Sequence, residues 1–580
     1  MKSKILIFIV SVLFIIGVSS CNDNSFLKES PTSFYTADNS YNTVSQVEAS
    51  VTNMYVHIRY WFQIDDYMKG LGTDYFDTPY WRCSGNGYSN YSTWNASNSN
   101  VLNIWNAFYM LVSYANETLE GASDSTKVKW DNSSEYNYVI AQAKFFRGFS
   151  YLTLGELFGG VPLVDKFYTT PKYDFTRSTR DSTYKFAIND LENAVSGMPD
   201  YPSEAGKVAK GATYHYLAEA YLALATINNN NKTYLDKSIA YATKAMNLHS
   251  LMTSRFGTRA TSGSGTAMNG VAAYYPSGDV FFDLFQRGNL DYCEGNNEAL
   301  WTLENDYSVY LKYGGDNYLP YPRNFSPVLR NVHWNSQYTG TNASPWQGLT
   351  TAYVGGRGVS SVRPTEYAID SIWAGKYASD IRNSAVNIRR KLVCMDPSSK
   401  YYGDTITTAM IDPATKEYMS PLWTKLAPID DWGYEDLSNG GNRSNMYRDD
   451  YACRLAETYL LRAEAYYREG DLTDAAADIN VLRKRAQCAY LVSPTDISLN
   501  LILDERAREL FSEERRWCTL LRMGGTVAVD RIKKYSYFAG TTSSYYQGTS
   551  AQPKDWNLFP IPQSIIDSNT GATLTQNSGY

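Results

Sequence analysis

Aromatic and hydrogen-bonding side chains gather in one loop near the amino-terminal end of the chain, residues 74–100. Trp81 and Trp94 supply flat apolar faces there, and Asp74, Arg82 and Asn95 supply polar groups. An indole ring can pack against the apolar face of a pyranose while carboxylate, guanidinium and amide groups bind the sugar hydroxyls. The loop therefore predicts a carbohydrate contact, and the alternative is that each ring anchors the loop to the body of the protein.

A second set of aromatic candidates lies later in the chain. These candidates are Tyr274, Tyr318, Trp334 and Trp346. The chain has 50 Tyr, 13 Trp and 22 Phe among 580 residues, so rings are abundant enough to line a binding surface as well as a core. We expect at least two rings from these regions to form one binding arc.

Carboxylates could instead indicate catalysis. Glu505, Glu509 and Glu513 recur every fourth residue, which places neighbours in this series on one face of a helix. Glycosidases use carboxylate pairs, but across a cleft and about 5–10 Å apart. Arginines interleave with these glutamates, so ion pairing on a helix surface or between helices is the better interpretation. The loop acids Asp74 and Asp77 are then the only evident candidates for a hydrolase.

The elements that must position these residues are mostly helices. Apolar residues recur at steps of three and four, which is typical of amphipathic helices. The predicted helices span residues 42–60, 101–120, 135–158, 182–195, 207–226, 234–248, 451–469, 472–487 and 499–522.

Two of the predicted helix pairs resemble each other. The sequence Tyr-Leu-Ala-Glu-Ala-Tyr at 216–221 opens one pair, and Leu-Arg-Ala-Glu-Ala-Tyr at 461–466 opens the other. Both pairs have small alanines at the helix contact beside large residues, and the second has a Gly-Asp turn at 470–471. These features are similar to those of tetratricopeptide units, which stack to bury their apolar faces. Generic antiparallel helices with alanine at the contact are the alternative.

Periodicity largely fails between residues 251 and 450, where glycine, proline, asparagine and aromatic residues are frequent. Abundant rings and a low net charge argue against disorder. We predict a mostly α-helical protein: an amino-terminal scaffold at 21–250 with the aromatic loop, a loop-rich inserted lobe at 251–450 with short strands and helices, and carboxy-terminal helix pairs at 451–580 that complete a tetratricopeptide-like scaffold.

Residues 1–20 are predicted to form a signal peptide of the lipoprotein type. Lys2 and Lys4 precede an apolar run at 5–16, and small residues lead to Cys21. The run is shorter than the about 20 residues that span a bilayer. We expect Cys21 to be acylated and to tether an exported body; an ordinary cleaved signal with a chance cysteine is the alternative.

Composition excludes some other classes of function. A formal charge of −6 gives no basic footprint for nucleic acid. The four histidines are far apart and the cysteines form no CxxC pair, so no zinc site is indicated. We expect no cofactor, and the Asp- and Asn-rich loops leave open a structural Ca²⁺ ion. Cys453, Cys488 and Cys518 fall in helical patterns and are expected to be buried.

Several segments, in order, resemble the SusD/RagB family of surface lipoproteins. They lie at residues 146–152, 158–163 (Phe-Gly-Gly-Val-Pro-Leu), 297–300, 362–365, 503–510 with 515–517 and 521–522, and at the close, 559–562 and 576–580. Ser578 stands where proline is commoner in the family's terminal signature. The segment Leu-Asp-Glu-Arg-Ala-Arg-Glu-Leu at 503–510 is the strongest of these.

The resemblance implies a glycan-binding lipoprotein of the outer membrane, facing the cell surface, that delivers oligosaccharide to a SusC-like TonB-dependent transporter without cleaving it. It also implies a helical scaffold on the transporter and a loop lobe that faces the ligand. The alternatives are a tethered glycoside hydrolase or lyase and a tetratricopeptide-type protein that binds peptide or protein.

Overall fold

The computed structural model describes residues 40–64, 69–77, 94–261, 277–313, 318–338, 343–346, 358–394, 396, 398–427, 445–536 and 557–580. The predicted signal peptide and Cys21, the greater part of the aromatic loop with Trp81 and Arg82, and Tyr274 lie outside the described residues. In the described residues, no helix combines the length and apolar character needed to cross a membrane.

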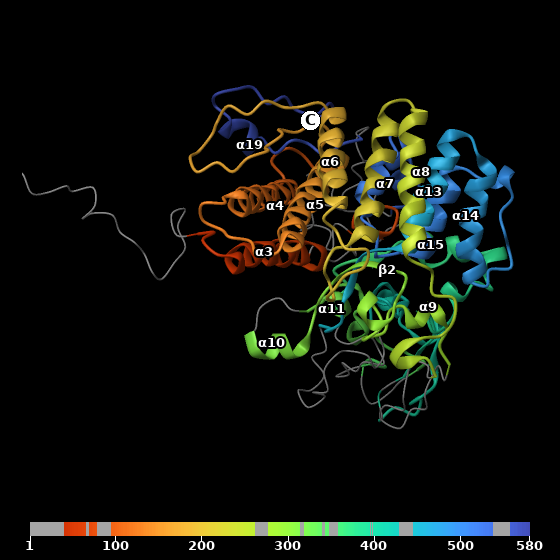
Figure 1. The fold of residues 1–580 in the computed structure, drawn as a ribbon. Helices are drawn as coiled ribbons and strands as arrows, with labels where there is room; N and C mark the ends of the chain where they lie inside the picture. Colours follow the sequence, from red (N-terminus) through yellow and green to blue (C-terminus); the bar gives the residue numbers. More distant parts are fainter. Residues whose placement is uncertain are drawn as a thin grey trace, which may run out of the picture.

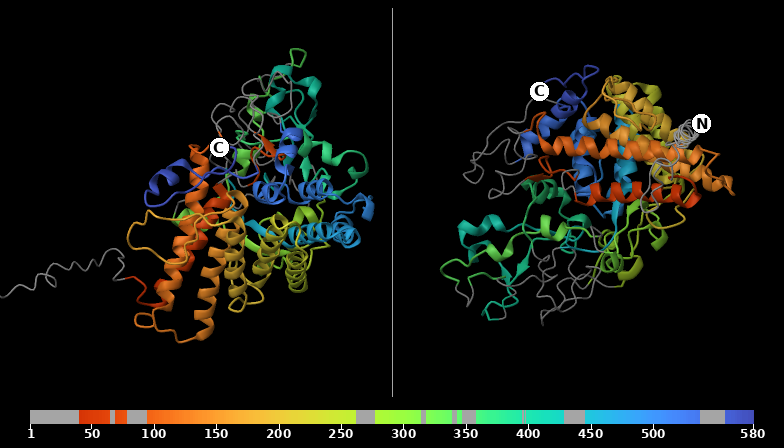
Figure 2. Two further views of the ribbon diagram at one scale, coloured as in Figure 1. Left: turned by 90° about the horizontal axis from the view of Figure 1, so that it is seen from above. Right: turned by 90° about the vertical axis from the view of Figure 1, so that its left-hand side faces the viewer.

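Long helices packed side by side form the scaffold (Figures 1 and 2). Each helix from α4 to α8 packs against the next, and α8 packs against α13, so the two similar pairs, α7–α8 and α13–α14, are neighbours. The scaffold helices are α3 Val44–Ile64, α4 Ser99–Ser123, α5 Ser133–Leu157, α6 Arg180–Val195, α7 Lys210–Ile227, α8 Lys232–Leu248, α13 Leu455–Glu469, α14 Leu472–Arg485, α15 Leu499–Leu510, α16 Arg516–Arg522, α17 Val527–Tyr535 and α19 Gln563–Ser568. The predicted mostly helical class is confirmed.

Local sequence explains where several helices begin and end. Asn132 caps α5 by accepting a hydrogen bond from the Ser134 amide, and Asp471 caps α14 through the Asp474 amide. Gly470 ends α13 with a φ of 95°, a left-handed conformation that suits glycine. The turn between α13 and α14 is therefore specified by adjacent residues.

Short elements make up the part of the chain between α8 and α13. Its helices are α9 Val280–Asp283, α10 Tyr307–Tyr313, α11 Tyr321–Phe325 and α12 Glu366–Ile369, and its 3₁₀ turns are Gly257–Arg259, Tyr292–Glu294, Leu329–Asn331, Ser371–Trp373, Gly375–Tyr377, Ile381–Asn383, Thr408–Met410 and Pro413–Tyr418; a further turn, Pro494–Asp496, follows α14. In the part of the chain that the structure describes, four two-stranded antiparallel sheets pair β1 Phe76–Asp77 with β3 Arg363–Pro364, β2 Ala299–Leu303 with β8 Asp450–Arg454, β4 Ile388–Arg389 with β7 Leu422–Trp423, and β5 Leu392–Val393 with β6 Thr405–Ile406.

Two predicted helix boundaries are wrong. The helix expected at 451–469 begins at Leu455, because residues 450–454 form β8, a wholly buried strand paired with β2. The helix expected at 499–522 breaks after Leu510, and Ser512 has a φ of 64°. Between the two helices, α15 and α16, lie the buried acids Glu513 and Glu514.

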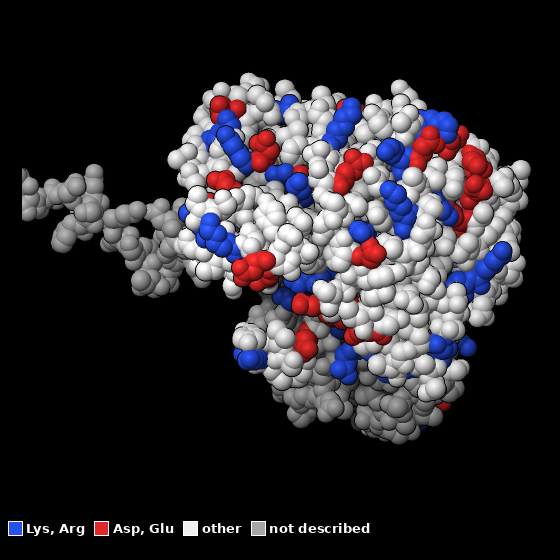
Figure 3. Space-filling model, viewed as in Figure 1, with Lys and Arg blue, Asp and Glu red and all other residues white. Residues whose placement is uncertain are grey.

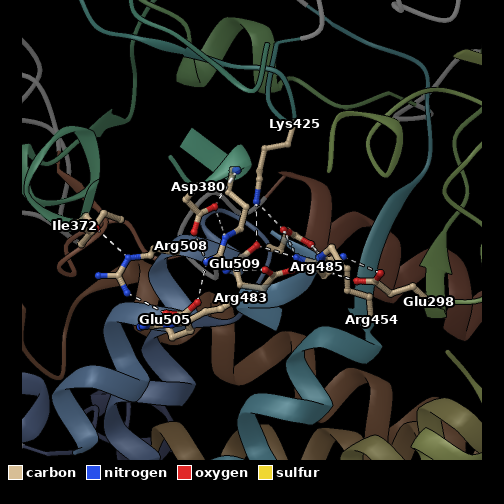
Figure 4. Close-up of polar contacts among 12 residues, drawn as sticks. Glu298, Ile372, Asp380, Lys425, Arg454, Arg483, Arg485, Glu505, Arg508 and Glu509 are labelled. Carbon is tan, nitrogen blue, oxygen red and sulfur yellow. Dashed lines mark hydrogen bonds and ion pairs between the residues drawn. The ribbon is translucent and has the colours of Figure 1, made fainter. Parts of the chain in front are cut away.

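A buried network of charges joins this irregular part to the scaffold (Figure 4). Glu509 on α15 binds Arg382 at 2.9 Å and Arg454, where β8 meets α13, at 2.7 Å, and it also pairs with Arg485 on α14. Glu298, just before β2, binds Arg454 at 2.6 Å. One carboxylate therefore holds three separate chain segments together.

Glu505, one helical turn earlier, makes the same kind of contact with Arg382, Arg483 and Arg508 at 2.7–3.0 Å. Burial alone would raise the pKa of Glu505, but these guanidinium groups lower it to about 2. The ion-pairing interpretation is confirmed, with the pairs inside the protein rather than on a helix surface. A carboxylate held ionised in this way has no proton to donate as a general acid.

The predicted burial of three cysteines is confirmed, but Cys453 lies in strand β8 and Cys488 follows the end of α14. Cys453, Cys488 and Cys518 are buried, with exposed fractions of 3%, 6% and 0%. Each carries a free thiol, as do the buried Cys394 and the exposed Cys293. These five thiols make no disulfide with one another in the structure.

Candidate functional site

Asp74 does not face solvent. Its side chain is fully buried, and its carboxylate binds Arg516 at 2.6 and 2.8 Å and Arg531 at 2.8 and 2.9 Å. Burial works to raise its pKa, but the two guanidinium groups lower the pKa to about 2. The prediction that Asp74 contacts a ligand is corrected: its hydrogen-bonding capacity is spent on tying the start of the loop to α16 and α17.

The other described end of the aromatic loop is also anchored. Trp94 is 2% exposed, stacks on Trp517 with ring centroids 6.2 Å apart, and meets Phe559 edge to face at 4.7 Å. Trp94 is thus an anchor, and its predicted role as a stacking surface is corrected. Asn95 is exposed, although its Oδ1 accepts a hydrogen bond from the Ser97 amide at 2.9 Å. Trp81 and Arg82, between these anchors, remain predictions.

Two tryptophans of the later region belong to a small core of their own. Trp346 has no exposed surface and donates its indole N–H to the Val393 carbonyl at 2.7 Å, so the prediction that it stacks on ligand is corrected. Trp334 is 8% exposed and packs beside Tyr401, with centroids 5.2 Å apart. In the described part of the chain its Nε1 is buried and has no hydrogen-bond partner, so the indole N–H does not face solvent.

Tyr318, another predicted site residue, belongs to a group of rings at one edge of the molecule. We call Tyr307, Tyr310, Tyr318 and Tyr447 the tyrosine cluster. Its centroids lie 4.8–6.4 Å apart, and the rings stack or meet at tilted and edge-to-face angles. Helix α10, which supplies two of the rings, protrudes below α3 in Figure 1.

Helix α10 also presents apolar surface to solvent beside the cluster. Tyr313 is 71% exposed and Leu311 is 66% exposed. Tyrosines at 307, 310 and 313 are three residues apart and lie on neighbouring positions of the helix. The sequence carries this signal as Tyr-x-x-Tyr-x-x-Tyr, inside a region that is predicted to be rich in loops.

Two acidic residues, Glu304 and Asp449, lie close in sequence to members of the tyrosine cluster. Glu304 follows β2, and Asp449 precedes β8 and accepts a hydrogen bond from the Asn305 amide at 2.9 Å. Burial, and after it the charge of Asp291, raises the pKa of Glu304 to about 7. Burial and the nearby Glu304 raise the pKa of Asp449 well above its usual value. Burial at this end of the β2–β8 pair therefore favours the protonated forms of Glu304 and Asp449.

A hollow of about 160 Å³ lies between α3, β2 and the turn before α7. Arg59, Lys207, Thr302 and Glu304 line it among others, and Lys207 sits over the ring of Tyr55 at 5.0 Å. The hollow offers charges of both signs beside an aromatic wall. Among the described residues, no three acidic, histidine or cysteine side chains are placed to hold a metal ion.

The geometry does not suit glycoside hydrolysis at the acids suggested by the sequence. Asp74 is held ionised by arginines, and the Asp77 carboxylate is buried and accepts a hydrogen bond from Ser536 at 2.8 Å. Glu304 and Asp449 lie close enough for each to affect the pKa of the other, and Asp449 accepts a hydrogen bond from the Asn305 amide. The described surface offers instead the tyrosine rings on and beside α10, which have apolar faces and polar hydroxyls.

Comparison with known proteins identifies the family. A family model described as "SusD family" matches residues 330–580, and another described as "Starch-binding associating with outer membrane" matches residues 25–222. The chain belongs to the SusD family. The first match includes the buried charges of α15 and α16, and the second includes the helices from α3 to the middle of α7.

Curated relatives of this SusD-family chain match it over limited stretches. "Starch-binding protein SusD" of Bacteroides thetaiotaomicron is 39% identical over 127 residues, 22% of this chain and 21% of that protein. "SusD-like protein" of Bacteroides ovatus is 26% identical over 243 residues, 40% of this chain and 41% of that protein. The aligned regions thus cover less than half of these relatives.

Solved structures of SusD-like proteins share the fold over nearly the whole length. A SusD homologue from Bacteroides thetaiotaomicron has a TM-score of 0.67 at 19% identity, covering 94% of this chain and 99% of that one. A "Laminarin binding SusD-like protein" has a TM-score of 0.60 at 18% identity, covering 92% and 99%. At these identities the likeness establishes the fold.

Proposed function

We propose that this SusD-family protein is a non-catalytic carbohydrate-binding protein that captures oligosaccharide at the outer membrane. The observation that carries the proposal is the tyrosine cluster with the exposed Tyr313 beside it. Tyrosine offers a flat apolar face with a polar edge, which suits sugar rings. Relatives named for starch and laminarin binding support the same class of ligand.

The ligand contacts would combine these rings with side chains from other parts of the chain. Asn95 is exposed, and Trp334 lies in the later aromatic region. Together with Trp81, Arg82 and Tyr274, they are the residues that we propose for the rest of the site. The hydrogen-bonding groups would set specificity, because a site left with unpaired polar groups rejects the wrong ligand.

The setting of the protein forms part of the proposal. Acylation of Cys21 would fix it to the outer membrane facing outward, and a SusC-like TonB-dependent transporter would receive the oligosaccharide. Support comes from the sequence around Cys21 and from the family model described as associating with the outer membrane. Acidic and basic side chains are interspersed over the face shown in Figure 3, so no single-sign footprint for nucleic acid appears there.

A binding screen tests the proposal. The purified protein is titrated with starch-derived, laminarin-derived and other oligosaccharides, and the mixtures are assayed for new reducing ends. We expect saturable binding to at least one glycan and no increase in reducing ends. Release of reducing ends would instead establish a hydrolase, and peptide binding with no glycan bound would establish a peptide receptor.

A further inference from the structure

Two adjoining depressions lie on the scaffold, at the end where the carboxy-terminal segment meets the long connection between α5 and α6. One is an apolar hollow of about 260 Å³ whose wall includes Trp105, Tyr109, Phe175, Ile565 and Leu574. The other is an open cleft of about 450 Å³. Lys172 and Tyr173 border both, so the two depressions adjoin at these residues.

The open cleft carries the groups that a sugar ring needs. Tyr173 is 53% exposed and offers the more open ring for stacking, while Tyr168 is 36% exposed and has the Lys166 ammonium over its ring at 5.2 Å. Thr170 and Thr570 line the cleft with exposed hydroxyls. The ion pair of Lys172 with Asp174 supplies a charged donor and acceptor at the same edge. Aromatic walls with a few polar groups are typical of small-ligand sites of this size.

The apolar hollow has few hydrogen bonds to offer. The Tyr109 hydroxyl donates to the Pro162 carbonyl at 2.7 Å, and the Ser568 hydroxyl donates to the Ser564 carbonyl at 2.7 Å. The Asn569 amide is engaged with the main chain of Phe175 at 2.8 and 2.9 Å. Since its polar side chains are already paired, the hollow favours an apolar group.

The walls are fixed in place before any ligand arrives. Gly571 donates its amide to the Tyr173 carbonyl at 2.7 Å, and Arg177 binds the carbonyl groups of Phe158, Gly160 and Thr575. These contacts join the connection after α5 to the segment after α19, which lie together in Figures 1 and 2. Because these walls are already ordered, little binding free energy is lost to ordering them when a ligand binds.

We propose that these adjoining depressions form a second carbohydrate site, which binds a sugar unit bearing an apolar acyl group, with the ring on Tyr168 and Tyr173 and the acyl group in the hollow beside Ile565. The inference rests on the proposed carbohydrate-binding function, but it concerns a different surface, formed by α4, α19 and the connection after α5. The tyrosine cluster belongs to α10 and to residues 318 and 447.

A pair of matched trisaccharides tests this. Chitotriose and cellotriose have the same linkage but differ in the N-acetyl groups, and their binding is measured by saturation-transfer NMR and calorimetry. We expect chitotriose to bind at least fivefold more tightly than cellotriose. The Tyr173→Ala variant should weaken chitotriose binding about tenfold, and Ile565→Trp, which fills the hollow, should remove the preference for the acetylated sugar.

Control variants separate this site from the tyrosine cluster. Tyr60→Ala removes an exposed ring from α3 and should leave chitotriose binding unchanged, as should Tyr313→Ala on α10. Equal binding of the two trisaccharides, or chitotriose binding unaffected by both Tyr173→Ala and Ile565→Trp, would overturn this inference. Loss of all glycan binding in Tyr313→Ala alone would overturn it too, while supporting the first site.

Discussion

Arg382 and Glu509 form an ion pair of 2.9 Å in which neither side chain is exposed to solvent. Arg382 comes from the irregular part of the chain and Glu509 from α15, 127 positions later. A buried charge without its partner is costly, so this pair and its neighbours fix how the irregular part of the chain sits on the scaffold. The charge-dense segment at 503–516 is therefore structural, and the proposed ligand contacts lie elsewhere, on surface rings.

Removing Arg382 should destabilise the whole protein. Arg382→Met leaves Glu505 and Glu509 with fewer cations in the interior, and we expect a loss of about 3–5 kcal/mol in the free energy of unfolding. Urea denaturation measures it. The matched control is Lys185→Met, which breaks an exposed pair with Asp181 and should leave the free energy of unfolding nearly unchanged. Equal losses in the two variants would contradict the structural role of the network.

The same network should make the protein sensitive to acid. The pKa values of Glu505 and Glu464 are lowered from 4.5 to about 2, because surrounding arginines outweigh the effect of burial. Their contribution to stability is complete above pH 4.5 and is lost as the pH falls toward 2. Thermal unfolding followed at pH 6, 4 and 3 should show a steadily falling midpoint. A midpoint independent of pH over this range would show that these carboxylates are not ionised in the fold.

Glu304 should have the opposite effect on the pH dependence of stability from Glu505 and Glu464. Its pKa is raised from 4.5 to about 7 by burial and by Asp291, so the folded protein holds a proton that the unfolded chain releases. Stability from this group is present below pH 4.5 and is lost as the pH rises through 7. Glu304→Gln should therefore raise the unfolding midpoint at pH 8 relative to the parent and change it little at pH 4.5. A variant less stable at pH 8 would contradict this.

Trp94 tests the distinction between an anchor and a binding surface. Because it packs against Trp517 and Phe559 in the interior, Trp94→Ala should cost about 3–5 kcal/mol of stability by leaving a cavity. The fraction that remains folded should bind oligosaccharide as the parent does. Weaker binding with unchanged stability, measured by calorimetry and urea denaturation, would return Trp94 to the ligand site.

The helical scaffold could be predicted from the sequence because its signals are local. Spacing of apolar residues located the long helices, and the Gly-Asp turn at 470–471 marked the end of α13. Burial of the acids at 505 and 509 could not be predicted in this way, because it depends on arginines at 382, 454, 483 and 485 that only the fold brings together.

The binding rings were harder to predict for a related reason. From the sequence alone, Trp94 and Trp346 cannot be told apart from tryptophans that stack on a ligand. Only their neighbours in space show that both are buried. Tyr318 could be chosen as a candidate from its type and region. Its partners Tyr307, Tyr310 and Tyr447 are brought to it by helix α10 and by the segment before β8, which no local pattern relates.

The central claim is that the exposed Tyr313 and the partly exposed tyrosines beside it on α10 hold an oligosaccharide without cleaving it. The most direct measurement is a calorimetric titration of the parent protein, Tyr313→Ala and the control Tyr60→Ala with the best glycan from the screen. Loss of one stacking ring should weaken binding about fivefold to thirtyfold in Tyr313→Ala, with no change in unfolding midpoint and none in the control. Equal affinity in all three proteins would contradict the claim.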